Sequence, residues 1–184
     1  NYLVREKHDS PLRHVNITLR IKAPEFIMRQ WYKHIVGAAY TPAREPDTAW
    51  NEISGRYVEY PDEFYVPSTF RQQAKVNKQG TTDEPVVSSV AAEEVYSTAV
   101  KHAYNSYKEL LTLGVGRELA RTVLPLGFYT EVLWTASLQA ILNFISLRDH
   151  DNAQREIREY AIAVKSLLAD IVPHTMTAWE TYRG

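Results

Sequence analysis

Alternating apolar and polar residues mark the beginning of the chain, in the stretch HVNITLRIKA. Apolar side chains occupy every second position from Val15 to Ile21, and this period of two is typical of a strand with one buried face. Pro24 ends the alternation and suits the first turn of a helix, because its φ angle is already close to the helical value. The pattern therefore predicts a strand over residues 15–22 that leads directly into a helix.

Helical spacing dominates the second half of the chain. Apolar or small residues recur every four positions between about residues 86 and 113, and Gly114 is placed to end this helix. The residues of this stripe are Ala91, Val95, Ala99, Ala103, Tyr107 and Leu111. The spacing predicts one long helix.

A strand and further helices are predicted after it. A short helix closed by Pro125 precedes FYTEVLWT, whose composition is typical of a strand. Ser137 can cap a helix that runs to about residue 147, and a last helical piece follows Pro173. Between them, an amphipathic helix is predicted from Ile157, Tyr160, Ala161, Val164, Leu168 and Ile171.

Loops fill the middle of the chain. Prolines and a glycine interrupt VGAAYTPAREPDTA, while KQGTTDEP is the most linker-like segment. No internal repeat divides the chain, so we predict a single domain over residues 1–184. An early sheet followed by helices indicates an α+β fold.

Composition excludes several classes of protein. The chain has 21 basic and 22 acidic residues, a balance that argues against non-specific binding to nucleic acid. No run of about 18 apolar residues and no signal peptide is visible, so we expect a soluble, cytoplasmic protein without membrane contact. Cysteine is absent, which excludes disulfides, thiolate metal sites and a thiol nucleophile. The twelve Tyr and four Trp suit either a well-filled core, a site that stacks flat rings, or a large subunit interface.

Familiar catalytic motifs are missing from the sequence. The six histidines show neither HxxxH nor HExxH spacing, and we therefore expect no metal site. The stretch GVG joins two helical patterns and follows no strand, so it does not read as a phosphate loop. A GxSxG elbow for serine catalysis is also absent.

Arginines in apolar or small-residue surroundings are the remaining chemical signal. Arg29, Arg56, Arg121 and Arg148 each need an acid or an anion, because burying an unpaired guanidinium is costly. Each one alone is more often a structural ion pair, whereas together they would clamp a phosphate. The stretch WNEISGRY sets an acid, a hydroxyl, a glycine and an arginine close together, and this combination indicates a binding site for a small anion.

Several motifs together resemble the flavin-dependent thymidylate synthases. KAPEFIMRQWYKH, NEISGRY, EFYVP, RELARTVLPLGFYT and LNFISLRDHDNAQREI occur in the order of that family, and the resemblance covers nearly the whole chain from His8 onward. It implies an antiparallel sheet flanked by helices and a homotetramer with shared active sites. The family carries a further N-terminal segment with a first strand, for which we expect no counterpart here.

The resemblance also implies the reaction. These enzymes methylate carbon 5 of deoxyuridylate, with methylene-tetrahydrofolate as carbon donor, FAD as hydride carrier and NADPH as reductant. Hydride transfer from a flavin removes the need for the cysteine nucleophile of classical thymidylate synthases, which this chain lacks. A fixed cation near the uracil carbonyls would stabilise the negative charge that develops on the ring.

By motif position, the resemblance assigns residues to the nucleotide. Arg148 corresponds to the arginine that faces and activates the uracil, and Ser54 has a hydrogen-bonding role. Gly55 lets the backbone approach the phosphate. The complete nucleotide set is Gln30, Lys33, Glu52, Ser54, Gly55, Arg56, Arg121 and Arg148.

The flavin side departs from the family. The flavin set is His8, Ser10, Lys33, His34, Ile35, Glu52, Ser137, Gln139 and Asn143. The family motif begins Arg-His-Arg where this chain reads Lys33-His34-Ile35, and residues 37–48 are an insertion in which Arg44 is a candidate replacement for the lost arginine. Ser137 and Gln139 stand where the family has Asn and Arg, and Arg13 stands where it has Glu.

These departures leave two questions of function open. UMP is an alternative substrate to dUMP, and Tyr40, Thr41 or Glu52 would be the partners of the ribose 2′-hydroxyl. A non-catalytic nucleotide-binding relative that has lost canonical flavin use is the second reading. Purified protein that carries a bound yellow cofactor would indicate the active enzyme, and its absence would indicate the non-catalytic relative.

Overall fold

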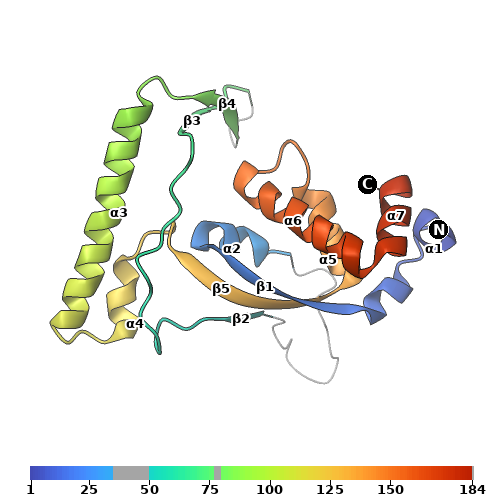
Figure 1. The fold of residues 1–184 in the computed structure, drawn as a ribbon, viewed down its shortest axis with the longest axis horizontal. Coiled ribbons are helices and arrows are strands. Elements are labelled where there is room, and N and C mark those ends of the chain that lie inside the picture. The colour runs from blue at the N-terminus through green and yellow to red at the C-terminus, as the bar shows by residue number, and fades with distance from the viewer. Residues whose placement is uncertain (35–49, 77–79, 184) are drawn as a thin grey trace. The chain divides into compact units, whose positions relative to one another are not determined.

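A computed structural model describes residues 1–34, 50–76 and 80–183 (Figure 1). Its helices are α1 (Tyr2–Arg5), α2 (Glu25–Trp31), α3 (Ser89–Thr112), α4 (Arg117–Ala120), α5 (Leu138–Arg148), α6 (Arg155–Ile171) and α7 (Pro173–Tyr182), with 3₁₀ turns η1 (Ser10–His14) and η2 (Arg121–Val123). Its strands are β1 (Asn16–Pro24), β2 (Trp50–Glu52), β3 (Arg71–Gln73), β4 (Thr81–Pro85) and β5 (Tyr129–Ser137). The chain forms two compact units. Unit 1 comprises residues 1–20, 30–51 and 133–184, and unit 2 comprises residues 21–29 and 52–132.

A three-stranded sheet has the order β1-β5-β2. The Leu138 N–H donates to the Val15 carbonyl at 2.7 Å, and the Glu25 N–H donates to the Phe128 carbonyl at 2.9 Å. The chain numbers rise on one strand as they fall on the other, so β1 and β5 run antiparallel. The α+β fold with an antiparallel sheet, predicted above, is confirmed.

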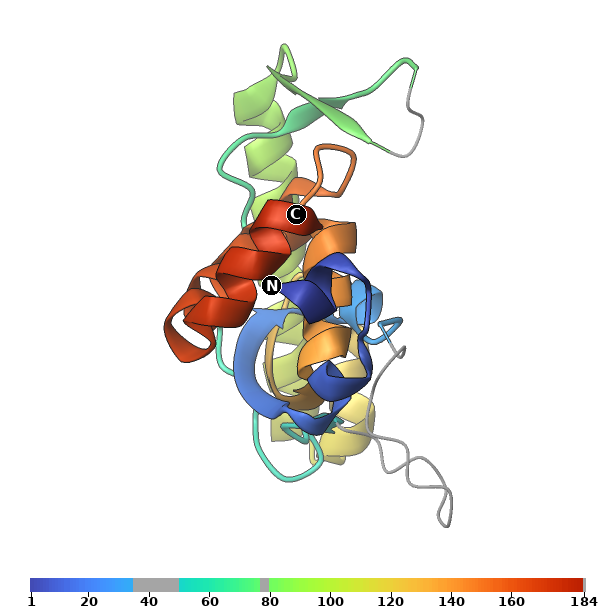
Figure 2. The ribbon, with the colours of Figure 1, turned by 90° about the vertical axis from the view of Figure 1, so that its right-hand side faces the viewer.

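Aromatic packing forms the core of unit 1. Trp31, Trp134 and Phe144 are fully buried, and the rings of Trp31 and Phe144 stack with centroids 4.4 Å apart. Each buried aromatic side chain contributes on the order of 1.5–3 kcal/mol through its loss of contact with water. Helix α5 packs on α6, and α1 lies beside α7, as Figures 1 and 2 both show. Much of the tryptophan surplus is thus used in this core.

Unit 2 has its core between α3 and the loops that follow β2. Tyr60, Tyr107 and Ala120 are buried there, with Leu124 and Phe128 among the side chains packed against them. Gly114, at a φ of 85°, ends the helix where the sequence predicted, because this left-handed conformation favours glycine.

One detail of the sequence prediction was wrong, and two of the predicted helical stripes are not buried along their whole length. KQGTTDEP is not a linker throughout, because its residues from Thr81 onward form β4, which pairs antiparallel with β3. The long stripe of α3 is not buried as a whole, since Tyr107 is fully buried while Val95 is 72% exposed. Spacing of four residues drifts by about 40° per step around a helix of 3.6 residues per turn, which carries the first half of the stripe away from the core. Ile171, at the end of α6, is likewise 56% exposed.

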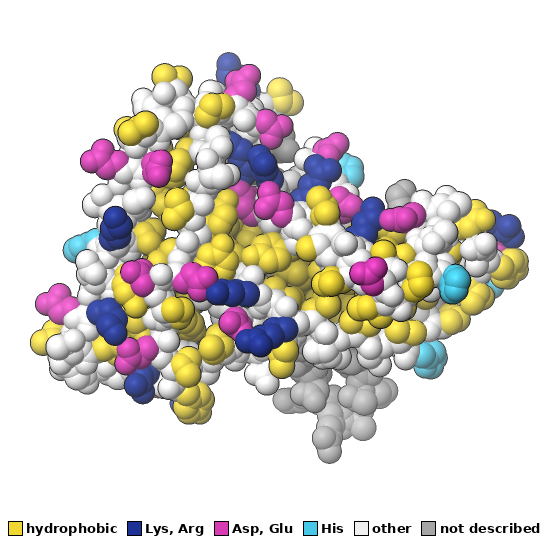
Figure 3. Space-filling view, in the orientation of Figure 1, with side chains coloured by type: hydrophobic (Ala, Val, Ile, Leu, Met, Phe, Trp, Pro, Cys, Tyr) yellow, Lys and Arg dark blue, Asp and Glu magenta, His cyan; other side chains and the backbone are white. Residues whose placement is uncertain are grey.

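No helix within the described part of the chain is both long and apolar enough to cross a lipid bilayer. Acidic and basic side chains lie interspersed on the face seen in Figure 3, without one dominant sign. Among these described residues, no three His, Asp or Glu side chains gather as the ligands of a metal ion would.

Candidate functional site

A cavity of about 410 Å³ lies in unit 2, and we call it the Ser54 pocket. Its polar lining consists of two carboxylates, two guanidinium groups, two aliphatic hydroxyls and one phenol. Apolar side chains form the rest of the wall. The lining residues are Glu25, Arg29, Glu52, Ile53, Ser54, Tyr60, Arg121, Thr122, Leu124, Leu126 and Phe128. Three residues of the predicted nucleotide set, Glu52, Ser54 and Arg121, are therefore brought together.

Strand pairing fixes the carboxylate of Glu52 and the turn after it. The Ile53 N–H donates to the Glu131 carbonyl on β5 at 2.9 Å. Thr130, on the same strand, donates its hydroxyl to Glu52 Oε1 at 2.7 Å. The chain then turns tightly, with the Tyr57 N–H donating to the Ser54 carbonyl at 3.0 Å. Ser54 is thus held at the first position of a turn that is anchored on β5.

Glycine is required at position 55 because of a neighbouring side chain. A Cβ atom added to Gly55 would lie 2.2 Å from Cε2 of Tyr60, a separation that no real contact reaches. The resemblance assigned this glycine to a close approach of the phosphate. In the structure the close approach is made by the ring of Tyr60, which the sequence analysis did not single out.

The acidic side of the pocket is electrostatically coupled. Burial raises the pKa of Glu25 above its ordinary value, and the nearby charge of Glu52 raises it further. Arg29, one helical turn along α2, lies 3.5 Å from the Glu25 carboxylate and opposes this rise. Glu25 carried no sequence signal beyond its favourable place at the start of a helix.

Arg56 does not line the Ser54 pocket. Its guanidinium lies 3.8 Å from the carboxylate of Glu118 and over the ring of Tyr57, 5.9 Å from the ring centroid. The side chain is 59% exposed. A salt bridge at this exposure contributes little to stability, about 0–1 kcal/mol, so it is easily exchanged for a stronger partner.

Arg148 and His34 form a hydrogen-bonded pair in unit 1. Arg148 Nε donates to His34 Nε2 at 2.9 Å, so the imidazole accepts on Nε2 and is neutral. Burial lowers the pKa of His34 to about 4, and the positive charge of Arg148 adds to this effect. Each guanidinium carries five N–H donors, and the bond to His34 fixes its orientation with only one of them.

Gln30 and Lys33 also belong to unit 1. The Gln30 amide donates to Gln154 Oε1 at 2.5 Å, and Gln154 in turn donates to Glu156 at 2.9 Å. Lys33 is exposed at the end of the turn after α2. The hydrogen bond of Gln30 links the end of α2 to the start of α6.

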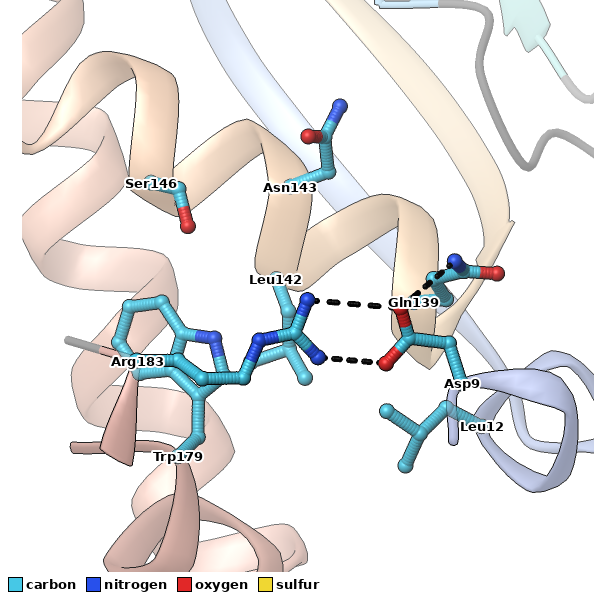
Figure 4. A pocket seen from close by; sticks show the side chains of 8 residues that line it. All are labelled: Asp9, Leu12, Gln139, Leu142, Asn143, Ser146, Trp179 and Arg183. Carbon is cyan, nitrogen blue, oxygen red and sulfur yellow. Dashed lines mark hydrogen bonds and ion pairs between the residues drawn. The ribbon is translucent and has the colours of Figure 1, made fainter. Parts of the chain in front are cut away.

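A second cavity, of about 170 Å³, lies in unit 1 and is called the Gln139 cavity (Figure 4). Gln139, Asn143 and Ser146 line it from one face of α5, while Trp179 and Arg183 approach from the C-terminal end. Asp9 and the apolar side chains of Leu12 and Leu142 complete the wall. The cavity thus contains Gln139 and Asn143 of the predicted flavin set.

A chain of polar contacts runs along this cavity. Arg183 donates to both carboxylate oxygens of Asp9, at 2.5 and 3.4 Å. The Gln139 amide also donates to Asp9, at 3.4 Å, and its oxygen accepts a hydrogen bond of 2.7 Å from Arg13 Nε. Asp9 and Arg183 were missed by the sequence analysis, since nothing in the sequence relates two residues so far apart along the chain.

The other predicted flavin residues have different surroundings. Ser137 is buried, and its hydroxyl caps α5 by accepting from the Ala140 N–H at 3.2 Å, as its sequence position predicted. His8 and Ser10 are exposed before and at the start of η1. Ile35, the insertion at residues 37–48 and the candidate replacement Arg44 lie outside the described residues, as do Tyr40 and Thr41.

Comparison with known proteins identifies relatives over the whole length. Residues 1–174 match the family described as "Thymidylate synthase complementing protein". The flavin-dependent thymidylate synthase of Thermosipho melanesiensis is 36% identical, over 100% of this chain and 76% of its own length. That of Kosmotoga olearia is 38% identical, over 97% of this chain and 73% of its own length.

Solved structures give the same result. The UMP/dUMP methylase PolB from Streptomyces cacaoi, bound with 5-Br dUMP, superposes with a TM-score of 0.82 at 29% identity, covering 98% of this chain and 77% of that one. Its complex with 5-Br UMP gives a TM-score of 0.83 at 29% identity, covering 98% and 80%.

Proposed function

We propose that this chain, which belongs to the flavin-dependent thymidylate synthase family, methylates carbon 5 of a uridylate, either dUMP or UMP. It is an enzyme of that type, and the family implies a flavin cofactor. The observation that carries the proposal is the Ser54 pocket, in which Glu52, Ser54 and Arg121 converge within one unit. Methylene-tetrahydrofolate as carbon donor and NADPH as reductant complete the proposed reaction.

The Ser54 pocket has the groups that a nucleotide phosphate and sugar require. The guanidinium of Arg121 can donate two parallel hydrogen bonds to a phosphate, and the hydroxyl of Ser54 can donate a third. Glu52, held by Thr130, presents a carboxylate oxygen as an acceptor for a sugar hydroxyl. Exposed Arg56 adds positive charge to the same turn.

Arg148 is the proposed activator of the uracil ring. When carbon 6 of the ring accepts hydride, negative charge develops on the carbonyl oxygens, and a fixed cation nearby stabilises that charge. The hydrogen bond from Arg148 to neutral His34 fixes the guanidinium before substrate binds. Because the pKa of His34 is about 4, this arrangement persists throughout the neutral pH range. Gln30 and Lys33 complete the proposed nucleotide set.

The Gln139 cavity supports the proposed flavin contacts. Gln139, Asn143 and Ser146 offer amide and hydroxyl groups on one helix face, a donor and acceptor set that fits the polar edge of a flavin. The volume of the cavity would hold part of such a cofactor. His8, Ser10, Lys33, His34, Ile35, Glu52 and Ser137 are the remaining proposed contacts. Reduced FAD, when bound, supplies the hydride.

UMP is the second candidate substrate, favoured by one comparison. PolB, a UMP/dUMP methylase, was solved with analogues of both nucleotides and superposes on nearly all of this chain. Glu25 and Glu52 together place two carboxyl groups in the Ser54 pocket, and a ribose offers them one more hydroxyl than deoxyribose does.

We also propose a homotetramer with shared active sites, in the cytoplasm. The first half of α3 supports an interface between copies, because Val95 is 72% exposed on the same helix face as exposed Ala91 and Ala99. Small and branched apolar side chains on one helix face permit close packing of a second helix. Sedimentation equilibrium that gives the mass of a single chain would contradict this assembly.

Turnover by purified protein tests the function. The protein is supplied with FAD, NADPH and methylene-tetrahydrofolate, and the 5-methyl nucleotide formed from dUMP or UMP is quantified by mass spectrometry. Product from dUMP alone defines a thymidylate synthase, and product from UMP defines a ribonucleotide methylase. Absence of product from both, with no flavin retained, would overturn the proposal.

A further inference from the structure

Tyr60 lies at the back of the Ser54 pocket and belongs to neither set of residues assigned by the resemblance. We propose that Tyr60 is a positioning residue, whose ring supports the Gly55 backbone and whose hydroxyl holds Arg121 for the phosphate of a nucleoside monophosphate. The inference rests on the proposed function. It adds a residue that shapes the anion-binding end of the site without contacting the reacting atoms.

The ring of Tyr60 is seated against the turn that carries Ser54. A Cβ on Gly55 would lie 2.2 Å from Cε2, 2.8 Å from Cζ and 2.9 Å from the hydroxyl oxygen of Tyr60. The hydroxyl end of the ring, as well as its edge, therefore lies beside the Gly55 backbone. The turn is thereby supported from the side of the core.

The hydroxyl oxygen lies near two groups of the predicted nucleotide set. Tyr60 lines the same pocket as Arg121, whose side chain opposes the rise in the phenol pKa, and the hydroxyl end of the Tyr60 ring lies beside Gly55. A guanidinium has five N–H donors, so Arg121 can satisfy Tyr60 and still present a pair of donors to an anion. Burial and the charge of Glu52 raise the pKa of the Tyr60 phenol, which therefore stays protonated at neutral pH.

Tyr60 itself is held firmly. Its backbone N–H donates to the Tyr107 hydroxyl at 3.2 Å, and the Tyr104 hydroxyl lies 3.5 Å from its carbonyl oxygen. The ring of Phe128 packs against it with centroids 4.8 Å apart. Tyr60 is only 6% exposed and Tyr107 is fully buried. Because Tyr60 is held in place, it can in turn hold Gly55 and Arg121 in place.

A residue that merely fills the core would need the ring but not the hydroxyl. Tyr60→Phe separates the two roles, because it keeps the ring against Gly55 and removes only the hydroxyl that is proposed to hold Arg121. Tyr96→Phe is the matched control, since it removes a hydroxyl in the same unit that donates to the Tyr65 carbonyl and does not line the pocket. Circular dichroism of both variants verifies that each one folds.

Isothermal titration of the full chain with UMP, dUMP and uridine provides the test. For Tyr60→Phe we expect UMP and dUMP to bind about tenfold more weakly, because a bond that orients a charged group is lost. Uridine, which lacks the phosphate, should bind unchanged. Tyr96→Phe should leave all three affinities unchanged. Equal weakening for uridine and UMP, unchanged UMP affinity, or tighter UMP binding would each overturn the inference.

A double variant adds a second readout. If Tyr60 acts through Arg121, then Tyr60→Phe should have no further effect on UMP affinity once Arg121→Gln is present. Additive losses would contradict the coupling. Wild-type protein that binds neither UMP nor dUMP would instead overturn the proposed function, and this inference with it.

Discussion

Arg13 and Gln139 are joined by a hydrogen bond of 2.7 Å from Arg13 Nε to Gln139 Oε1. The sequence analysis noted both as separate departures, since the family has Glu where this chain has Arg13, and Arg where it has Gln139. The contact makes these two positions hydrogen-bonded partners. The guanidinium comes from η1 and the acceptor from α5, so a cation lies beside the Gln139 cavity.

The pairing predicts that an acid at position 13 and an arginine at position 139 can replace it together. Arg13→Glu alone and Gln139→Arg alone should each lower the free energy of unfolding by about 1 kcal/mol, because each leaves one partner unmatched. The double variant should recover most of the loss, giving a coupling of about 1 kcal/mol in a double-mutant cycle. Urea unfolding followed by circular dichroism measures the free energy of unfolding of each variant. Strictly additive losses would show that the two side chains are not coupled.

His34 should make stability depend on pH. Burial and Arg148 hold its pKa near 4, below the value of about 6.5 expected in the unfolded chain. The unfolded state therefore binds the proton first, so this stability is fully present above pH 6.5 and is lost as the pH falls toward 4. The loss is at most about 3–4 kcal/mol.

Matched variants isolate this contribution. His34→Gln should flatten the pH dependence of unfolding between pH 6.5 and 4. His102→Gln, at an exposed position on α3, should leave the dependence as it is in the wild type. If the free energy of unfolding depends on pH equally in both variants, His34 is not the group responsible for the pH dependence.

Gly55→Ala should destabilise the protein by about 1–3 kcal/mol, because the new methyl group cannot coexist with the Tyr60 ring. Gly116→Ala is the control, since no heavy atom lies within 4 Å of a Cβ there. That change should alter stability by about 0.5 kcal/mol or less. Thermal unfolding distinguishes the two, and an equal response of both glycines would refute the role given to Tyr60.

Asp9 and Arg183 should control the order of the C-terminal helix. Asp9→Asn removes the charge that receives Arg183, so α7 should exchange its backbone amide hydrogens faster while α3 remains unchanged. Hydrogen exchange with mass spectrometry resolves the two helices. Unaltered exchange in α7 would mean that apolar packing alone holds it.

The periodic elements were predictable, because their side chains report a repeating environment. β1 and α5 follow from alternation and from the Ser137 cap, both of which are local in sequence. The contact between Tyr60 and Gly55 and the one between Asp9 and Arg183 depend on how distant segments meet. Neither carries a periodic signal.

The resemblance supplied residue identities that periodicity could not. It placed Glu52, Ser54 and Arg121 in one set, and the structure brings these three to one cavity. It also included Arg56, whose side chain pairs with Glu118 at the surface. A long arginine side chain has several rotatable bonds, and its direction is set by whichever acid is within reach.

The distribution of tryptophan gives the two units separate spectroscopic reporters. All four tryptophans, Trp31, Trp50, Trp134 and Trp179, belong to unit 1, whereas the buried aromatic residues of unit 2 are tyrosines. Emission excited at the red edge of the tryptophan band therefore follows unit 1, while circular dichroism also follows helix α3 of unit 2. Denaturation curves that coincide by both signals mean that the units unfold as one, and curves that separate assign the order in which they unfold.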